Sequence, residues 1–130
     1  MERVMGRYSD LLYSLMRLVA GALFACHGAQ KLFGVLGGQT QLGNPKMLAA
    51  GVIEFFGGLL VALGLGAAYA AFVASGEMAV AYFQAHAPGG FWPVQNRGEL
   101  AVLDCFVFLY VAARGDGTVS LARAIRRGRR

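Results

Sequence analysis

The chain has 130 residues, of which 57% are hydrophobic and only 15% are charged, and its formal net charge is +5. This composition excludes an ordinary small soluble domain and favours one domain built in a membrane. The basic excess does not indicate nucleic-acid binding, because six of the twelve lysines and arginines lie in residues 114–130, which form a short tail rather than a folded basic face.

Four hydrophobic segments follow one another along the chain, at about 8–36, 47–65, 67–86 and 99–113. A bilayer-spanning helix needs about 20 residues. The segments show no alternation of period two, so we expect helices rather than strands. The sequence therefore predicts an all-α protein: an integral membrane four-helix bundle that forms one domain over 1–130, with a basic tail at 114–130.

The arginines orient these segments. Arg3 and Arg7 precede the first segment and the tail follows the last one, whereas the two long loops hold only Lys46 and Arg97. Cytoplasmic flanks of membrane helices carry an excess of lysine and arginine. We therefore expect a multi-pass protein of the cell (inner) membrane with both termini in the cytoplasm and its tail facing anionic lipids.

Ionisable side chains interrupt the hydrophobic segments. A charge near the bilayer centre costs about 2.5–3.5 kcal/mol on insertion scales, so such groups should face the bundle interior and find partners. With a rise of about 1.5 Å per residue, one group from each segment reaches a similar depth in the outer half: His27, Glu54, Glu77 and Asp104. Lys31 lies one turn shallower. We predict that Glu54 and Glu77 point inward and that at least one lies near His27 or Lys31.

The stretch HAPGGFWPVQNRGE joins the third and fourth segments and is dense in polar and aromatic residues. Its prolines restrict the backbone and its paired glycines allow a sharp turn, so we expect an ordered lid. Phe91 and Trp92 should turn inward over the bundle. Asn96 should bond loop backbone groups or cap the fourth helix. Glu99 should lie in the first turn of that helix, where it could reach Lys31.

Three stretches resemble the DoxX family of four-helix bacterial membrane proteins: RLVAGALFACHGAQKLFG (17–34), GVIEFFGGLLVALGL (51–65) and GEMAVAYFQAHAPGGFWPVQNRGELAVLDCFVFLYVAARGDG (76–117). The resemblance implies a role in membrane redox chemistry, since some relatives look like subunits of thiosulfate:quinone oxidoreductase. Others are associated with sulfurtransferases and oxidative-stress enzymes. Arg97 and Asp104 depart from the family's usual pattern.

The first functional hypothesis is therefore a quinone-coupled oxidoreductase component. The candidate proton relay is formed by Glu54, Glu77 and His27, and the candidate pocket and lid by Lys31, His86, Phe91, Trp92, Asn96 and Glu99. Aromatic side chains, among them Phe55 and Tyr82, are candidates for an apolar slot around the ring. The sequence has no CxxC, dinucleotide-binding or haem motif. Electrons would then have to travel on a diffusible quinone or on a partner's cofactor.

Two other functions stay open at this stage, as does whether the chain is itself an enzyme. The protein could be a membrane anchor or assembly factor whose basic tail recruits a soluble redox or sulfurtransferase partner. It could also be a small-molecule or ion carrier that uses its acids as coupling sites. The expected surroundings are a lipid bilayer without nucleic acid, and a homo-oligomer is open too. No spacing indicates a metal site, and Cys26 and Cys105 fit simple space-filling.

Overall fold

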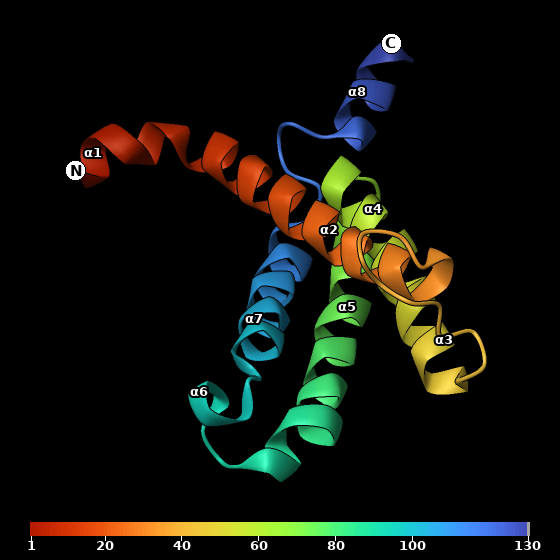
Figure 1. The fold of residues 1–130 in the computed structure, drawn as a ribbon. Helices are drawn as coiled ribbons and strands as arrows, with labels where there is room; N and C mark the ends of the chain where they lie inside the picture. Colours follow the sequence, from red (N-terminus) through yellow and green to blue (C-terminus); the bar gives the residue numbers. More distant parts are fainter. Residues whose placement is uncertain (130) are drawn as a thin grey trace.

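The computed structural model describes residues 1–129, which contain helices and no strand (Figure 1). The first helical stretch consists of α1 (Glu2–Met5), a 3-10 turn and α2 (Ser9–Phe33). The second contains α3 (Pro45–Val52), a π-helical turn called η2 (Ile53–Gly57) and α4 (Gly58–Leu63). The all-α class expected from the sequence is confirmed.

The second half of the chain contains two further long helices, α5 and α7, and ends in a short tail helix. Its elements are α5 (Ala67–Ala81), the π-helical turn η3 (Tyr82–His86), the 3-10 turn η4 (Ala87–Gly89), α6 (Pro93–Asn96), α7 (Glu99–Arg114) and α8 (Leu121–Gly128). Figure 1 shows α5 and α7 side by side, with α2 crossing them and its N-terminal end extending beyond the other helices.

Capping residues explain where several helices begin and end. The Asn44 side chain accepts hydrogen bonds from the backbone nitrogens of Lys46 and Met47, and Pro45 occupies the first turn of α3. Gly34 ends α2 in a left-handed conformation, with φ of 66°. The first helix therefore stops at Phe33, three residues before the expected end at 36, because a left-handed glycine closes a helix.

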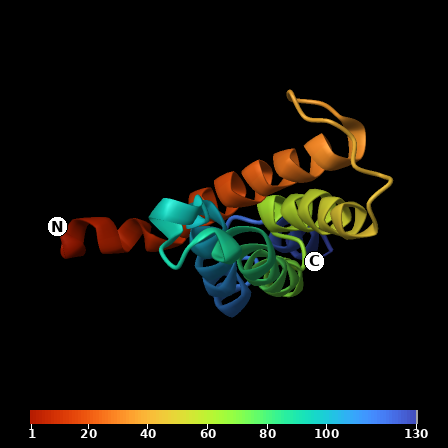
Figure 2. The same cartoon turned by 60° about the horizontal axis from the view of Figure 1, so that its bottom comes forward.

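Glycines let α2 lie almost in backbone contact with the second helical stretch. A Cβ placed on Gly58 would lie 2.5 Å from the backbone nitrogen of Ala25, and one on Gly28 would lie 2.7 Å from the carbonyl oxygen of Gly51. Small residues allow this approach in membrane proteins, where packing replaces the hydrophobic effect between helices. Figure 2 shows α2 alongside α3 and α4.

Small side chains also join α5 to α7. Ala71 and Ala74 on α5 are fully buried, as are Phe108 and Val111 on α7. The Phe108 ring reaches across to α2, where its centroid lies 4.6 Å from that of Phe24. The alanines of α5 thus leave room for the larger side chains of α7, and the core connects three helical stretches.

The segment that follows α7 is held against the other helices by hydrogen bonds of Val119 and Asp116. Arg17 is 2% exposed. Its guanidinium donates to the carbonyls of Val61 and Ala62 at the end of α4, and to that of Val119. The Asp116 side chain accepts from the backbone nitrogen of Ala67 at 2.7 Å, which caps α5. Arg17 is therefore a clamp inside the protein, not a side chain that reaches out to head groups.

Two helical stretches within residues 1–129 are long and apolar enough to cross a membrane, Glu2–Phe33 and Pro45–Leu63. Large hydrophobic side chains are exposed along both, including Leu15, Leu23 and Phe56. Such a surface suits a lipid environment. A span count of four, and the orientation of the termini, stay predictions.

Candidate functional site

Glu54 and Lys31 form the centre of the candidate site. Both carboxylate oxygens of Glu54 lie 2.5 Å from the Lys31 ammonium nitrogen. The Glu54 side chain is 3% exposed and that of Lys31 is 24% exposed. The expected contact between an inward-facing acid and one of the two bases on the first helix is confirmed.

The local backbone explains why Glu54 faces α2. Glu54 lies in the π-helical turn η2, and such turns inside α-helices are frequent at functional sites. The stretch formed by α3 and η2 packs against α2 at Gly28. Because Gly28 has no side chain, the backbones of the two helical stretches lie almost in contact there. Lys31 lies three residues further along α2, so its long side chain can reach back to the carboxylate.

Glu77 brings a second carboxylate to the same region from α5. The side chain is half-buried, and its Oε2 atom is buried without a hydrogen-bond partner within residues 1–129. The charges that act on it are those of Glu54 and Lys31. Ionisable groups from three helical stretches therefore lie in one region, where the Lys31–Glu54 pair is in contact and one oxygen of Glu77 has no hydrogen-bond partner within residues 1–129.

A groove of about 900 Å³ runs between α3 and α5, and Glu77 forms part of its wall. Lys46 and Gln84 are the other strongly polar residues there, and the remaining lining is aliphatic or small, including Ile53 and Val73. The aromatic slot proposed around Phe55 and Tyr82 does not line this groove. The groove thus combines apolar walls with a few polar groups, as ligand sites commonly do.

Sequence reasoning missed Lys46 and Gln84. Gln84 follows Glu77 by seven residues, which is two helical turns, so both side chains lie on one face of the helix. Lys46 is the first base after the Asn44 cap, at the start of the helix that carries Glu54. The spacing of Glu77 and Gln84 and the position of Lys46 after the Asn44 cap are visible in the sequence. Only the packing of α3 on α5 brings Lys46 and Gln84 to one groove.

His27 lies outside this cluster, against the expectation that it would share a relay with Glu54 and Glu77. Its side chain is exposed on α2, and its electrostatic neighbour is Asp104 on α7. The reason is rotational: Gly28 occupies the face of α2 that touches η2, and the preceding residue is turned by about 100° from it. The imidazole of His27 is too short to reach around α2 to Glu54, whereas the longer side chain of Lys31 reaches it.

The 86–98 segment is ordered by Asn96. Its amide donates to the Gly90 carbonyl at 2.9 Å and to the Tyr82 hydroxyl at 3.2 Å, and its side-chain oxygen accepts from the Gly98 nitrogen at 2.8 Å. The His86 ring lies 3.2 Å from the Asn96 carbonyl. The expectation that Asn96 bonds loop backbone groups is confirmed.

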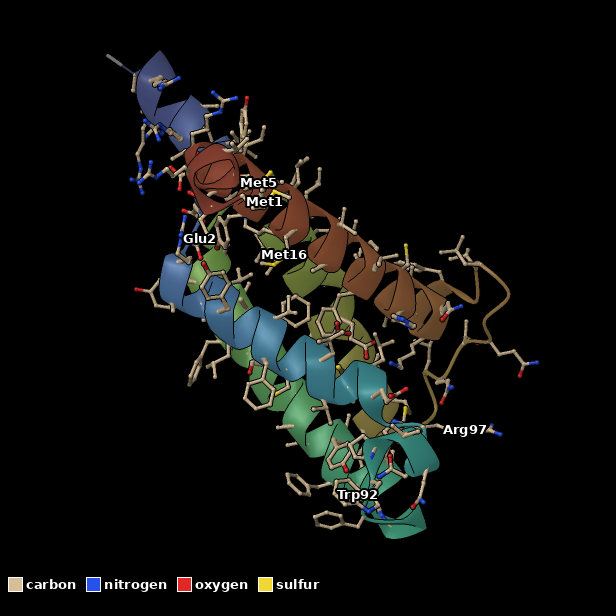
Figure 3. All side chains as sticks on the ribbon, turned by 90° about the vertical axis from the view of Figure 1, so that its left-hand side faces the viewer. Met1, Glu2, Met5, Met16, Trp92 and Arg97 are labelled. Atoms are coloured by element: carbon tan, nitrogen blue, oxygen red, sulfur yellow. The ribbon has the colours of Figure 1, made fainter. Side chains whose placement is uncertain are left out.

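Phe91 and Trp92 do not turn inward, and this part of the lid prediction is wrong. The two side chains are 79% and 61% exposed. Figure 3 shows Trp92 at the tip of this segment and Arg97 projecting from it. The Tyr82 ring already fills the interior of the segment, since a Cβ on Gly98 would lie 2.7 Å from it. The two neighbouring rings are therefore left on the outside.

Glu99 does not reach Lys31 either. It is exposed at the start of α7, and Lys31 is bound by Glu54. The sequence-predicted residues thus do not form one site. Glu77 lines the groove, with the Lys31–Glu54 pair near it. His86 and Asn96 belong to the hydrogen-bonded 86–98 segment. Four further candidates have exposed side chains: His27, Phe91, Trp92 and Glu99.

The residues described hold no cluster of three or more His, Cys, Asp or Glu side chains that could bind a metal ion. Cys26 and Cys105 are both free thiols, one exposed on α2 and one partly buried on α7. The Cys105 sulfur lies 3.5 Å from the Ser75 hydroxyl. The polar groups that line the groove are those of Glu77, Lys46 and Gln84.

Comparisons with known proteins agree with this membrane-helix architecture. The family model of DoxX matches residues 12–87. A Haemophilus influenzae protein described as an uncharacterized protein is 39% identical over 122 residues, covering 88% of this chain and 91% of its own length. No solved structure matches the chain.

Proposed function

Because the chain belongs to the DoxX family, we propose that it is a multi-pass protein of the cell (inner) membrane and a quinone-coupled component of a membrane oxidoreductase. Four helical stretches would cross the bilayer, with both termini in the cytoplasm. The exposed apolar surfaces of Glu2–Phe33 and Pro45–Leu63 support the membrane part of this proposal. The groove between α3 and α5 supports the redox part.

The observation that carries the redox proposal is that Glu77 lines the groove and that its Oε2 atom is buried without a hydrogen-bond partner within residues 1–129. A buried polar atom without a partner costs on the order of 1–3 kcal/mol, so a ligand that supplies a partner gains that interaction. A quinone ring has two carbonyl oxygens on an otherwise apolar body. It suits aliphatic walls with polar groups at Glu77 and Gln84.

The geometry also supports a role for these groups in proton transfer. Reduction of a quinone to a quinol takes up electrons and an equal number of protons. Protonated Glu77 would donate a hydrogen bond to a ring carbonyl and then its proton. Glu54 lies near Glu77 as a carboxylate paired with Lys31, and it would pass to Glu77 a proton that it first takes up from the Lys31 ammonium or from water, once for each of the two protons of the quinol. Lys31 holds Glu54 in place and balances its charge.

The electrons for this reduction would come from the cofactor of a soluble partner.

The tail helix α8 favours a second function, in which the protein anchors a soluble partner at the membrane. Ser120 caps α8 by accepting from the Arg123 nitrogen at 3.3 Å, and the Ala122 nitrogen donates to the Gly64 carbonyl. Exposed arginines follow at Arg123, Arg126 and Arg127. A basic helix fixed to the bundle could dock an acidic surface.

Ligand binding tests the quinone proposal. The protein is placed in lipid nanodiscs and titrated with a benzoquinone that carries a decyl chain. We expect wild-type binding, and binding weakened at least about tenfold in Glu77→Leu, which removes one charged or protonated hydrogen-bond partner. Glu77→Gln keeps a donor and should bind like the wild type.

Asp104→Leu is the matched control, because it replaces another half-buried acid, on α7, away from the α3–α5 groove. It should bind the quinone as the wild type does. Absence of binding to the wild-type protein, or equal binding by Glu77→Leu, would refute the proposal.

A further inference from the structure

The groove that holds Glu77 continues toward the other end of α5. A second hollow of about 410 Å³ lies between the η2–α4 stretch and α5. Ile53 and Val73 line both hollows. The two are therefore sections of one groove, an upper section with Glu77 and a lower section that ends near Tyr69.

The lower section differs from the upper one in chemistry. Its lining is glycine, leucine and other apolar residues, with Tyr69 at its end. Gly57 and Gly66 give it depth, since a Cβ at either position would meet nothing within 4 Å. Eight residues of α5 separate Tyr69 from Glu77, which corresponds to about 12 Å. The lower section is thus an apolar extension of a site that contains polar groups.

We propose that the lower section binds the first isoprenoid units of the ligand's tail, so that the protein selects quinones with a branched isoprenoid chain. This inference rests on the proposed function, because it assumes that a quinone ring lies beside Glu77. The tail is bonded to the ring, and the lower section adjoins the upper one, so a ring beside Glu77 can extend its tail into the lower section. Methyl branches on the tail can occupy the open spaces at Gly57 and Gly66. A straight chain would leave these spaces empty.

Packing, rather than hydrophobicity, must produce the selection. Lipid chains are as apolar as the tail, so moving the tail from lipid into the groove gains only the difference in van der Waals contact. An unfilled space beside a straight chain loses those contacts. The expected preference is therefore moderate, on the order of tenfold in affinity.

The experiment compares two ligands with the same benzoquinone ring and the same number of tail carbons. One carries a straight decyl chain and the other a geranyl chain made of two isoprene units. Both are titrated into the protein in nanodiscs, with concentrations expressed per lipid so that partitioning cancels. We expect the wild type to bind the geranyl quinone about tenfold more tightly.

Gly57→Leu fills the lower section, and Gly57 is not among the residues that line the upper one. Because the leucine blocks the section to both tails, the geranyl preference should be lost and the two quinones should bind equally. Ala70→Leu, which fills the same section from α5, gives an independent variant should the first one fail to fold.

The outcomes separate the two proposals. Equal binding of both quinones by the wild type, or a geranyl preference that survives both leucine variants, refutes the tail site and leaves the ring site standing. Failure of both quinones to bind the wild type ends the proposed function and the tail site with it. A geranyl preference that both leucine variants abolish supports the tail site.

Discussion

Lys31 and Glu54 bind each other across the contact between α2 and the π-helical turn η2, with the ammonium nitrogen 2.5 Å from both carboxylate oxygens. Because Glu54 is 3% exposed, Lys31 is the group that neutralises a charge held inside the protein. The pair fixes the position of one carboxylate and leaves Glu77 as the group that faces the groove.

Removal of Lys31 alone should destabilise the protein strongly. Lys31→Met leaves a buried carboxylate unpaired, which costs about 3–5 kcal/mol, whereas the double variant Lys31→Met with Glu54→Leu should recover most of that loss. Thermal unfolding in detergent, followed by circular dichroism, measures both. A Lys31→Met protein as stable as the wild type would show that the pair does not neutralise a buried charge.

The close approach of α2 to the second helical stretch should depend on Gly28. Gly28→Ala places a methyl group 2.7 Å from the Gly51 carbonyl oxygen, so the helices must move apart, at about 1–3 kcal/mol. Gly76→Ala is the control, because a Cβ there meets nothing within 4 Å and alanine favours a helix. We expect a lower unfolding temperature for the first variant and an equal or higher one for the second. The reverse order would contradict the packing described.

Asn96 should hold the 86–98 segment in place. Asn96→Ala removes the bonds to Gly90, Tyr82 and Gly98, each worth about 1 kcal/mol. Segment opening should then become more frequent, and trypsin should cut after Arg97 at least about tenfold faster. Gln95→Ala, at the exposed neighbouring position, should be cut at the wild-type rate. Equal cutting of both variants would mean that Asn96 does not order the segment.

Topology follows from the arginine asymmetry and is tested by labelling. Gln39→Cys and Arg127→Cys are introduced separately after Cys26 and Cys105 are replaced by serine. A membrane-impermeant maleimide should label position 39 in intact cells, and position 127 only after the membrane is opened. Labelling of both positions from outside, or of neither, would overturn the predicted orientation.

Helix positions could be predicted from the sequence because the hydrophobic runs end close to residues that cap helices or form turns. Asn44 and Pro45 mark the start of α3, and Gly98 precedes α7. The end of α2 was placed too late because the hydrophobic run continues through Val35 and Leu36 beyond the left-handed Gly34. The tail helix α8 was not predicted, since its stability depends on contacts with Arg17 and Gly64 that are distant in sequence.

Depth along the helices was easier to predict than rotation about them. Counting residues brought Glu54 and Glu77 to one level, and in the structure the charges of Glu54 and Lys31 both act on Glu77. The same count placed His27 with them, although its side chain lies on another face of α2. Trp92 was misplaced because the sequence does not show that Tyr82 already fills the inside of the loop. Which side chains contact one another depends on the rotation of each helix about its axis and on which side chain fills a given space. Both are determined only when the helices pack.

Photoaffinity labelling tests the quinone site most directly. A benzoquinone with an azide on its ring is illuminated with the protein in nanodiscs, and the labelled residues are mapped by mass spectrometry. We expect label on the walls of the α3–α5 groove around Glu77, suppressed by excess decyl quinone and by Glu77→Leu but not by Asp104→Leu. Label concentrated near His27 and Asp104, or spread over all exposed helices without competition, would contradict it.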